Sequence, residues 1–429
     1  MPDIRPFKGV LYNPEKVNIS EVVTEPYDVI SPVQQKSYYA LHPNNIVRLI
    51  LGEQYPADND KNNCYTRAAE FLNEWLRQDI LQRDKKESLY ICTQSFLHNG
   101  RKKSRTGVIA RLKLEAPEEN TVLPHENTFS QPVCDRLELT KAVQANLSPI
   151  FGLFPDERGE LNKLLNKWKK EHRPYFVFEK DKIAYKLWRL EEEKNISAVQ
   201  RLFKGKQVLI ADGHHRYEAA LKYKYFMQKR QNKPLSGAAF DYVMTYLAGT
   251  SDKGLTILPT HRALKVKGGI NSEELIQGLE KNFTVWSFTG REDMFSYLRV
   301  KHAARIFGVY LPGGRCYGLK LKNIRTLCAR EGIKSLQKDL DVVILHEVII
   351  KKLLAVIPRE GDIFYTRDAR EAAQLVDDEE YQISFFLCPT TLAQVRRIAQ
   401  AGERMPHKST YFYPKVLTGL VLNLLFEDK

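Results

Sequence analysis

Residues 208–225 constrain the fold of this chain more than any other segment. A short apolar run is followed by Asp212-Gly213-His214-His215-Arg216, and then by apolar residues at helical spacing. This order predicts a strand, a tight turn and a helix, so residues 212–216 should lie at a helix N-terminus. Unpaired backbone N–H groups and the positive end of the helix dipole point outward there, and both favour an anion such as phosphate.

The side chains of this turn offer more chemistry than a turn requires. Arg216 can hold phosphate or carboxylate with two hydrogen bonds. Asp212 can accept a proton or hold a metal ion, and His214 and His215 can donate hydrogen bonds, bind metal or shuttle protons. We expect Asp212 to be catalytic and Gly213 to Arg216 to bind phosphate. The structural alternative is that Asp212 only caps the helix, but capping does not require two histidines and an arginine.

Length and composition predict a globular protein of two or more domains. The chain has 429 residues, of which 43% are hydrophobic and 28% charged. It starts without a signal segment, and its longest nearly apolar stretch, residues 416–426, is too short to span a bilayer. The 6 cysteines form no close pairs, which argues against a disulfide framework or a cysteine-based zinc site. We therefore expect a cytoplasmic protein without a membrane partner.

The net charge of +14 permits anionic partners of several kinds. Lys and Arg are spread along the chain, and the densest clusters lie at 101–105 and 167–173. The first cluster follows Asn99-Gly100 and is expected to be a solvated strand end. No basic stripe interleaved with aromatic residues occurs, so we expect a small anionic metabolite or a nucleotide rather than nucleic acid.

The order of the predicted elements indicates an α+β fold with mixed sheets and packed helices. Asn99-Gly100 is a strong signal for a type I′ hairpin. Gly254 and Pro259 mark a boundary region, which predicts an N-terminal domain of residues 1–250 and a C-terminal α+β domain of residues 251–429. Helices are expected at 58–80, 135–147, 159–170, 194–203, 272–282, 340–357 and 392–401, and from Asp368. Strands are expected at 88–97, 106–114, 149–154, 175–179, 183–190, 207–211, 240–248, 283–288, 305–311, 362–366 and 382–388.

Three further segments are candidates for the site. In the proline-containing connection at 115–134, Glu126 beside His125 can act as a general base, although a solvated loop is the simpler reading of that segment alone. The segment 405–415 has hydroxyl and lysine donors for phosphate, including Lys408, Ser409 and Thr410, and it can equally be a rigid loop packed by its aromatic residues.

The third segment, residues 25–32, places Asp28 between prolines. Asp28 can be a ligand, but a turn residue is the favoured interpretation.

A metal ion is a further possibility at this turn. His214 and Glu218 share a helix face, and Asp212 and His125 can be added to them. There is no His-Glu-x-x-His motif, so Mg²⁺ on Asp212 and phosphate is a better expectation than zinc. Neither a Walker loop nor a Gly-x-Gly-x-x-Gly motif occurs, so the common nucleotide folds are not indicated.

Almost the whole chain resembles the bacterial and archaeal domain-of-unknown-function family numbered 1015. The matching stretches are Tyr27 to Pro32, His42 to Asn45, Leu123 to Glu126, Ser148 to Phe151, Ala211 to Tyr217, Leu258 to Arg262 and Met405 to Lys415. The family brings no settled activity to this chain.

The turn at 212–216 also resembles that of ParB-like and sulfiredoxin-like proteins, and especially of their free serine kinases. Those enzymes pair such a turn with an upstream Pro-His-Glu, and here Pro124-His125-Glu126 precedes the turn at a longer spacing. The resemblance implies that the turn grips the phosphates of ATP or ADP and that Glu126 activates the hydroxyl of serine.

The leading hypothesis is thus phosphoryl transfer on a small hydroxylated or phosphorylated metabolite, with serine or phosphoserine as the best guess. A kinase and a phosphatase fit the same residues. The alternatives are a ParB-like nucleotide- or nucleic-acid-binding regulator without turnover, and a metal-dependent hydrolase that uses His125, Asp212, His214 and His215.

Overall fold

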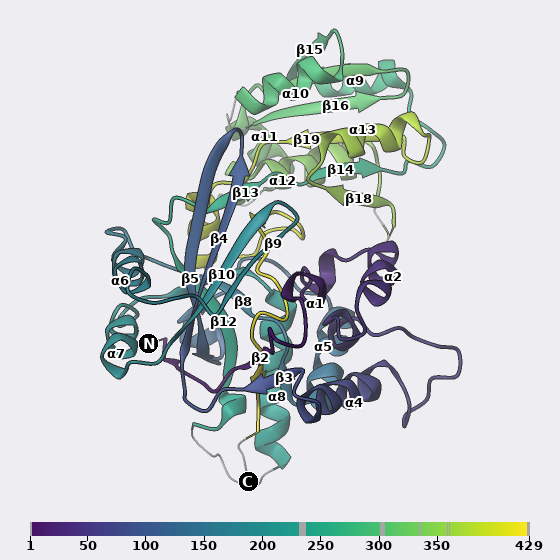
Figure 1. The fold of residues 1–429 in the computed structure, drawn as a ribbon. Coiled ribbons are helices and arrows are strands. Elements are labelled where there is room, and N and C mark those ends of the chain that lie inside the picture. The colour runs from purple at the N-terminus through teal and green to yellow at the C-terminus, as the bar shows by residue number, and fades with distance from the viewer. Residues whose placement is uncertain are drawn as a thin grey trace. The chain divides into compact units, whose positions relative to one another are not determined.

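The computed structural model describes residues 2–230, 237–300, 305–333, 336–357, 359 and 361–426. The chain forms two compact units (Figure 1). The first unit comprises residues 1–124, 128–255 and 414–429, and the second comprises 125–127 and 256–413. Each unit combines sheets with helices, which confirms the predicted α+β class. The predicted domain division after residue 250 stays a prediction.

The main sheet of the first unit has nine strands, in the order β6-β11-β8-β12-β5-β4-β10-β9 with β1 beside β5. These strands are β1 (Ile4–Arg5), β4 (Leu89–His98), β5 (Arg101–Lys113), β6 (Val122–Leu123), β8 (Ile150–Phe154), β9 (Phe176–Lys180), β10 (Ile183–Leu190), β11 (Val208–Asp212) and β12 (Tyr242–Gly249). Two small sheets pair β2 (Val10–Tyr12) with β3 (Leu81–Arg83), and β7 (Ala145–Asn146) with β21 (Asn423–Leu424).

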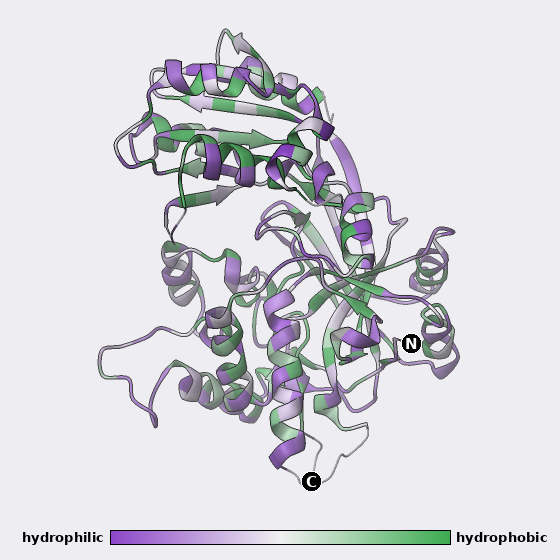
Figure 2. Cartoon of the chain, turned by 180° about the vertical axis from the view of Figure 1, so that it is seen from behind, coloured by the Kyte–Doolittle hydropathy of each residue, from purple (hydrophilic) through white to green (hydrophobic). Residues whose placement is uncertain are grey.

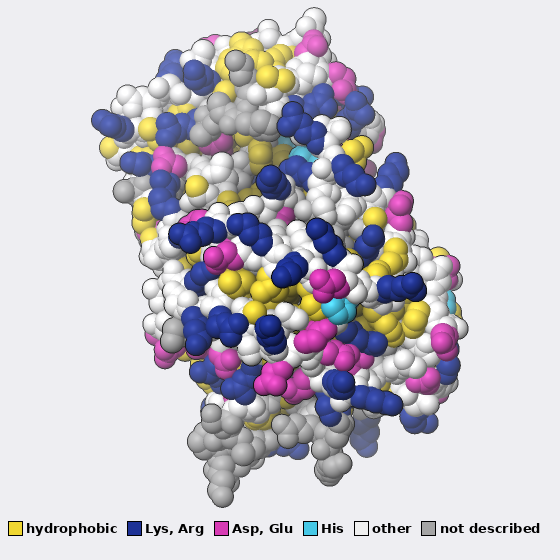
Figure 3. All heavy atoms as spheres, turned by 60° about the vertical axis from the view of Figure 1, so that its left-hand side comes forward, with side chains coloured by type: hydrophobic (Ala, Val, Ile, Leu, Met, Phe, Trp, Pro, Cys, Tyr) yellow, Lys and Arg dark blue, Asp and Glu magenta, His cyan; other side chains and the backbone are white. Residues whose placement is uncertain are grey.

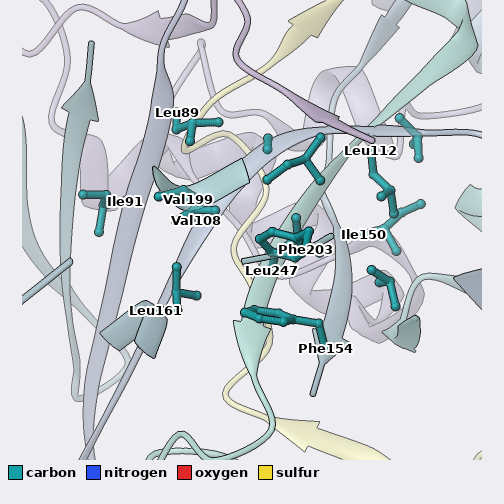
Figure 4. Close-up of a cluster of buried hydrophobic side chains, with 14 of the residues drawn as sticks. Leu89, Ile91, Val108, Leu112, Ile150, Phe154, Leu161, Val199, Phe203 and Leu247 are labelled. Atoms are coloured by element: carbon teal, nitrogen blue, oxygen red, sulfur yellow. The ribbon is translucent and has the colours of Figure 1, made fainter. Parts of the chain in front are cut away.

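The helices of the first unit supply part of its apolar core. They are α1 (Ile19–Val22), α2 (Pro32–Leu41), α3 (Val47–Ile50), α4 (Cys64–Arg77), α5 (Ser130–Val143), α6 (Glu160–Lys169), α7 (Glu193–Arg201) and α8 (His214–Arg230). Figure 4 shows Leu161 of α6 and Val199 of α7 among buried strand residues such as Ile91. Burial of this apolar surface stabilises the strands of the sheet. Because β11 is one of these strands, the start of the turn at 212–216 is held in place as well.

The second unit has a sheet of six strands in the order β15-β17-β16-β19-β14-β18. These are β14 (His261–Leu264), β15 (Phe283–Phe288), β16 (Ile306–Leu311), β17 (Arg315–Leu321), β18 (Ile363–Thr366) and β19 (Ile383–Leu387), while β13 (Thr256–Leu258) pairs with β20 (Tyr411–Tyr413). Its helices are α9 (Ser272–Glu280), α10 (Arg291–Val300), α11 (Ile324–Glu331), α12 (Asp341–Ile344), α13 (Ala369–Asp377) and α14 (Leu392–Gln400).

Local sequence signals predicted several of these elements correctly. Asn99 and Gly100 both have positive φ angles, 49° and 73°, as a type I′ turn requires. The helix predicted at 135–147 begins earlier, at Ser130, because Pro132 lies in the first turn, where its missing N–H breaks no hydrogen bond. The helix predicted at 58–80 is α4, which begins at Cys64 and is capped by Asn63.

The segment predicted as one long helix at 340–357 is helical, but much of it is not an α-helix. After the short α12, the chain forms a π-helix from Leu345 to Leu353. Hydrophobic periodicity locates a buried helical segment but does not distinguish α from π hydrogen bonding.

Within the described ranges, no helix combines the length and the hydrophobicity that a bilayer crossing needs. Helix α8, for example, carries hydrophilic as well as hydrophobic residues along its length (Figure 2).

Candidate functional site

The turn at 212–216 joins β11 directly to α8, as the sequence predicted. Gly213 has a φ of 91°, and an added Cβ there would lie 3.1 Å from the Arg216 guanidinium. A β-bulge between Ile210 and Asp212 interrupts the ladder with β8 just before the turn. Bulges re-aim the side chains beside them. Glycine is therefore needed at 213 both for its conformation and for the close approach of Arg216.

Asp212 lies between two cations. Its Oδ2 accepts a hydrogen bond from Nη2 of Arg216 at 2.8 Å, and its Oδ1 pairs with Nζ of Lys415. The three side chains are only 16%, 10% and 6% exposed for Asp212, Arg216 and Lys415. Burial alone would raise the pKa of Asp212, but Lys415 and Arg216 outweigh it and hold that pKa well below its usual range. The ionised triad carries one surplus positive charge at the positive end of the α8 dipole.

Two buried side chains of the main sheet position Lys415. Gln94 donates from Nε2 to the carbonyl of Lys415 at 2.8 Å, and Arg105 donates from Nη2 to the carbonyl of Pro414. Arg105 is fully buried and lies over Phe151, with 4.6 Å from its Cζ to the ring centroid. The prediction that the 101–105 cluster is entirely solvated is therefore wrong at Arg105, which faces the interior of the sheet.

The histidines of the turn are close to the protein interior. His214 is 8% exposed. His215 accepts at Nε2 from the backbone N–H of Phe129 at 3.1 Å and stacks on the Phe129 ring. Thr128 donates its hydroxyl proton to Glu218 of α8. These contacts bind the start of α5 to α8, so His215 has a structural role in addition to its predicted role in phosphate binding.

In the second unit, the predicted base Glu126 is held by the 405–415 segment. Its Oε1 accepts from the backbone N–H of Thr410 at 3.2 Å and from the Thr410 hydroxyl at 3.1 Å. His125 is fully buried, and its Nε2 lies 3.0 Å from Oγ1 of Thr410 and 3.8 Å from Oε1 of Glu126. The chain around them is fixed by a bond from the N–H of Met405 to the carbonyl of His125. The structure therefore brings two predicted segments, 123–128 and 405–415, together here.

The other phosphate-binding candidates of that segment make contacts within the second unit. Ser409 donates its hydroxyl to the carbonyl of Pro406, and the carbonyl of Lys408 accepts from Nη2 of Arg262 at 3.0 Å. Lys408 has a φ of 56°, a left-handed conformation for a residue with a side chain. Arg262 is 1% exposed, and burial lowers its pKa to about 10 while Glu126 opposes that shift. The surroundings of Glu126 are therefore cationic.

Asp28 lies in a short 3₁₀ helix, Tyr27–Val29, and is exposed to solvent. The neighbouring Tyr27 is stacked under Arg136 of α5, with 4.0 Å from its ring centroid to Cζ of the guanidinium. Within this segment, Tyr27 rather than Asp28 points into the protein.

The residues at the turn do not fit a resident metal ion on Asp212, because each carboxylate oxygen already faces a cation. Within the described part of the chain, no group of three or more His, Cys, Asp or Glu is placed to hold a metal ion. We therefore derive no chemical step through a metal ion.

Sequence reasoning named the lysines of the 405–415 segment as phosphate donors, but it missed the pairing of Lys415 with Asp212 and the roles of Tyr27 and Arg136. All three lie in or beside segments that the sequence singled out, but their contacts bridge residues far apart in the chain.

Basic residues on the face drawn in Figure 3 are interspersed with acidic and hydrophobic side chains rather than gathered into one stripe. Such a distribution on this face gives no extended electrostatic track for a nucleic-acid backbone.

The family profile described as "Protein of unknown function (DUF1015)" matches residues 4–343. The chain belongs to this family. No curated protein matches the chain.

Similar solved structures include a free serine kinase variant in complex with ADP, with 13% identity and a TM-score of 0.38 over 76% of this chain and 95% of that one. A conserved hypothetical protein from Pyrococcus furiosus has 14% identity and a TM-score of 0.34 over 75% and 97% of the two chains. SbnI from Staphylococcus aureus, truncated at its C-terminus, has 10% identity and a TM-score of 0.35 over 72% and 85%. These are distant similarities, and no inference for this chain rests on them.

Proposed function

We propose that this protein is a phosphoryl-transfer enzyme that acts on a small hydroxylated or phosphorylated metabolite, serine or phosphoserine in the first instance. The observation that carries the proposal is the buried triad of Asp212, Arg216 and Lys415 at the N-terminus of α8. Phosphoryl transfer requires phosphates held by cations and N–H donors, together with an oriented nucleophile. The surplus positive charge and the helix terminus supply the first requirement.

Asp212 serves this site as a counter-ion. An isolated pair of buried cations would repel each other, and the carboxylate between them keeps both charged and in place. In this proposal the phosphates bind the remaining N–H groups of Arg216, the ammonium of Lys415 and the backbone at Gly213 and His214. When the ligand binds, its charged phosphate oxygens replace the water molecules that Arg216 and Lys415 lose.

Glu126 is the proposed base for the nucleophile. Two hydrogen bonds to one oxygen from Thr410 fix the orientation of its carboxylate. The geometry is that of a positioned base rather than of a mobile surface glutamate.

In the kinase direction, the hydroxyl oxygen of serine forms a bond to the terminal phosphorus of ATP or ADP, and the bond from that phosphorus to the leaving phosphate oxygen breaks. The hydroxyl proton passes to Glu126, and the nucleotide leaves with one phosphate fewer. In the phosphatase direction, water takes the place of the nucleophile, and phosphoserine yields serine and inorganic phosphate. The choice of serine and of an adenine nucleotide comes from the sequence resemblance.

Phosphorus NMR tests the proposal and its direction together. Purified protein is incubated with Mg²⁺ in two mixtures, L-serine with ATP or ADP, and phosphoserine alone. Phosphoserine appearing in the first mixture supports a kinase, and inorganic phosphate in the second supports a phosphatase. Silence in both mixtures, with active controls, would refute serine phosphoryl transfer and favour a binding protein without turnover.

A further inference from the structure

The first unit contains a pocket with a volume of about 40 Å³. It lies where α5 and α8 meet the segment 145–148 and Tyr27. Its polar lining comes from Tyr27, Arg136, Thr140, Asn146, Ser148 and Arg216. Its remaining walls are mostly aliphatic side chains, including Leu139 of α5 and Ala220 of α8. Tyr27, Ser148 and Arg216 are only partly buried, so solvent reaches the pocket.

Two guanidinium groups line this pocket, and each is held by the protein. Arg136, 8% exposed, donates from Nε to Asp135 at 2.8 Å and from Nη1 to the carbonyl of Ile50 at 2.7 Å. Arg216 donates from Nη1 to the carbonyl of Pro149 and from Nη2 to Asp212. A guanidinium has five N–H donors, so each arginine keeps donors for a ligand after these bonds are made. Their positions are fixed in advance, which reduces the entropy that binding costs.

The third polar group is the hydroxyl of Tyr27. Burial, together with the nearby Asp28 carboxylate, raises the pKa of Tyr27 to about 12, although Arg136 and Arg216 oppose the shift. The hydroxyl therefore stays protonated at neutral pH and can donate to an anion. Its ring is held under Arg136, which orients it.

The volume of the pocket and the charged groups around it together determine which chemical group of a ligand can bind there. A water molecule needs roughly 10–15 Å³ on this measure, so the pocket accepts about three atoms of that size. The two guanidinium groups at the wall are each paired with one carboxylate, Arg136 with Asp135 and Arg216 with Asp212, and the Asp28 carboxylate lies near Tyr27. A planar group of three heavy atoms with one negative charge fits the volume and can accept hydrogen bonds from both guanidinium groups, whereas a phosphate dianion is too large and would bring a second negative charge beside these carboxylates.

We propose that this pocket binds the carboxylate of the acceptor substrate, which is accordingly a small hydroxy acid or amino acid. The inference rests on the proposed function, because Arg216 both lines the pocket and belongs to the phosphate-binding turn. One arginine shared between the two groups sets the hydroxyl of a three-carbon acid next to the phosphate site. The carboxylate occupies the volume of the pocket, so the carbon chain of the acid extends out of it.

Calorimetric titration with L-serine, glycolate, ethanolamine and inorganic phosphate tests the proposal. Ethanolamine is serine without its carboxylate, and glycolate is the simplest hydroxy acid. We expect both carboxylates to bind, and ethanolamine to bind more than about tenfold more weakly than L-serine, because a charge-assisted bond to a guanidinium is lost. Equal affinity for ethanolamine and L-serine, or no binding of either carboxylate, would overturn the proposal.

Variants locate the binding site. Arg136→Gln is expected to weaken L-serine binding about tenfold or more, and Tyr27→Phe about three- to tenfold, while inorganic phosphate binding stays within about twofold. Arg77→Gln and Tyr55→Phe are matched exposed controls and should change nothing. Tyr27→Phe keeps the ring in place, so it tests the pocket even if the Arg136 variant does not fold. Loss of phosphate binding in the Arg136 and Tyr27 variants would show that the pocket takes phosphate instead.

The two proposals fail in different ways. Binding of L-serine that depends on Arg136, without any turnover, would leave the carboxylate pocket standing and refute phosphoryl transfer. Turnover of ethanolamine as efficient as that of L-serine would retain phosphoryl transfer and refute the carboxylate pocket.

Discussion

Lys415 and Asp212 form a buried ion pair across 203 positions of sequence. The pair brings the C-terminal segment to the start of α8, where Arg216 contacts the other oxygen of the same carboxylate. The second cation on this carboxylate is thus supplied by tertiary structure rather than by the local sequence.

Replacement of Lys415 by Met should weaken binding of inorganic phosphate and of ATP by about ten- to a hundredfold, because one charge-assisted hydrogen bond is lost. Lys415→Arg retains the charge and should recover part of the affinity. Lys222→Met, an exposed lysine on α8, is the control and should leave affinity unchanged. Calorimetry on the three variants measures this, and equal affinity in Lys415→Met and the native protein would remove Lys415 from the site.

Replacement of Glu126 by Gln should reduce turnover about 10²–10⁴-fold, the usual contribution of a positioned base. The amide oxygen can still accept from Thr410, so the fold and substrate affinity should be retained. Glu118→Gln, at an exposed position, is the matched control. Phosphorus NMR gives the rates, and a decrease smaller than about threefold would exclude Glu126 as the base.

Replacement of Gly213 by Ala should destabilise the protein by about 1–3 kcal/mol and also weaken phosphate binding. The left-handed φ of 91° strains any side chain, and the new Cβ would crowd the guanidinium of Arg216. Gly205→Ala separates the two effects, because Gly205 has a φ of 71° with nothing within 4 Å of an added Cβ. Urea unfolding should show a loss of stability in both variants, and calorimetry a loss of affinity only in Gly213→Ala. Equal phosphate affinity in the two variants would contradict this.

Two buried histidines should reduce the stability of the second unit as the pH falls below about 6.5, while Asp341, whose pKa burial raises to about 7, acts in the opposite direction. Burial, reinforced by Arg262, lowers the pKa of His261 to about 3 and that of His346 to about 3. Between pH 3 and 6.5 the unfolded chain therefore binds protons that the folded chain does not, so stability falls as pH falls. At pH 5 each histidine should cost about 2 kcal/mol relative to pH 7.5.

Urea unfolding at the two pH values measures this loss. The variants His261→Gln and His346→Gln should each reduce the difference between pH 7.5 and pH 5, whereas His42→Gln, at a half-buried position of the first unit, should not. An unchanged pH dependence in the double variant would refute the assignment.

The features that could be predicted from the sequence are those that depend on residues close together in the chain. The helices predicted from Asp368 and at 392–401 begin where expected, and Asp368 and Thr391 cap them, because a cap depends on residues three positions away. The turn at Gly213 was predictable for the same reason. The ion pair of Lys415 and the burial of Arg105 depend on partners hundreds of positions distant or on other strands, and no local pattern signals them.

The same limit applies to the candidate site. The sequence predicted the 123–128 and 405–415 segments separately, and only the tertiary structure places Thr410 on Glu126. In residues 25–32 the sequence favoured Asp28 as the ligand candidate, because its side chain is charged. The structure places the ring of Tyr27 under Arg136, and no sequence pattern connects these two residues.

The return of residues 414–426 to the first unit has a consequence for synthesis. A ribosome adds roughly 5–20 residues each second, so Asp212 and Arg216 are made roughly 10–40 s before Lys415 is. During that interval the nascent first unit lacks β21 and the second cation of the turn. Until the final segment emerges, Asp212 therefore has Arg216 as its only partner in this triad, and a prematurely terminated chain would carry the turn without its second cation.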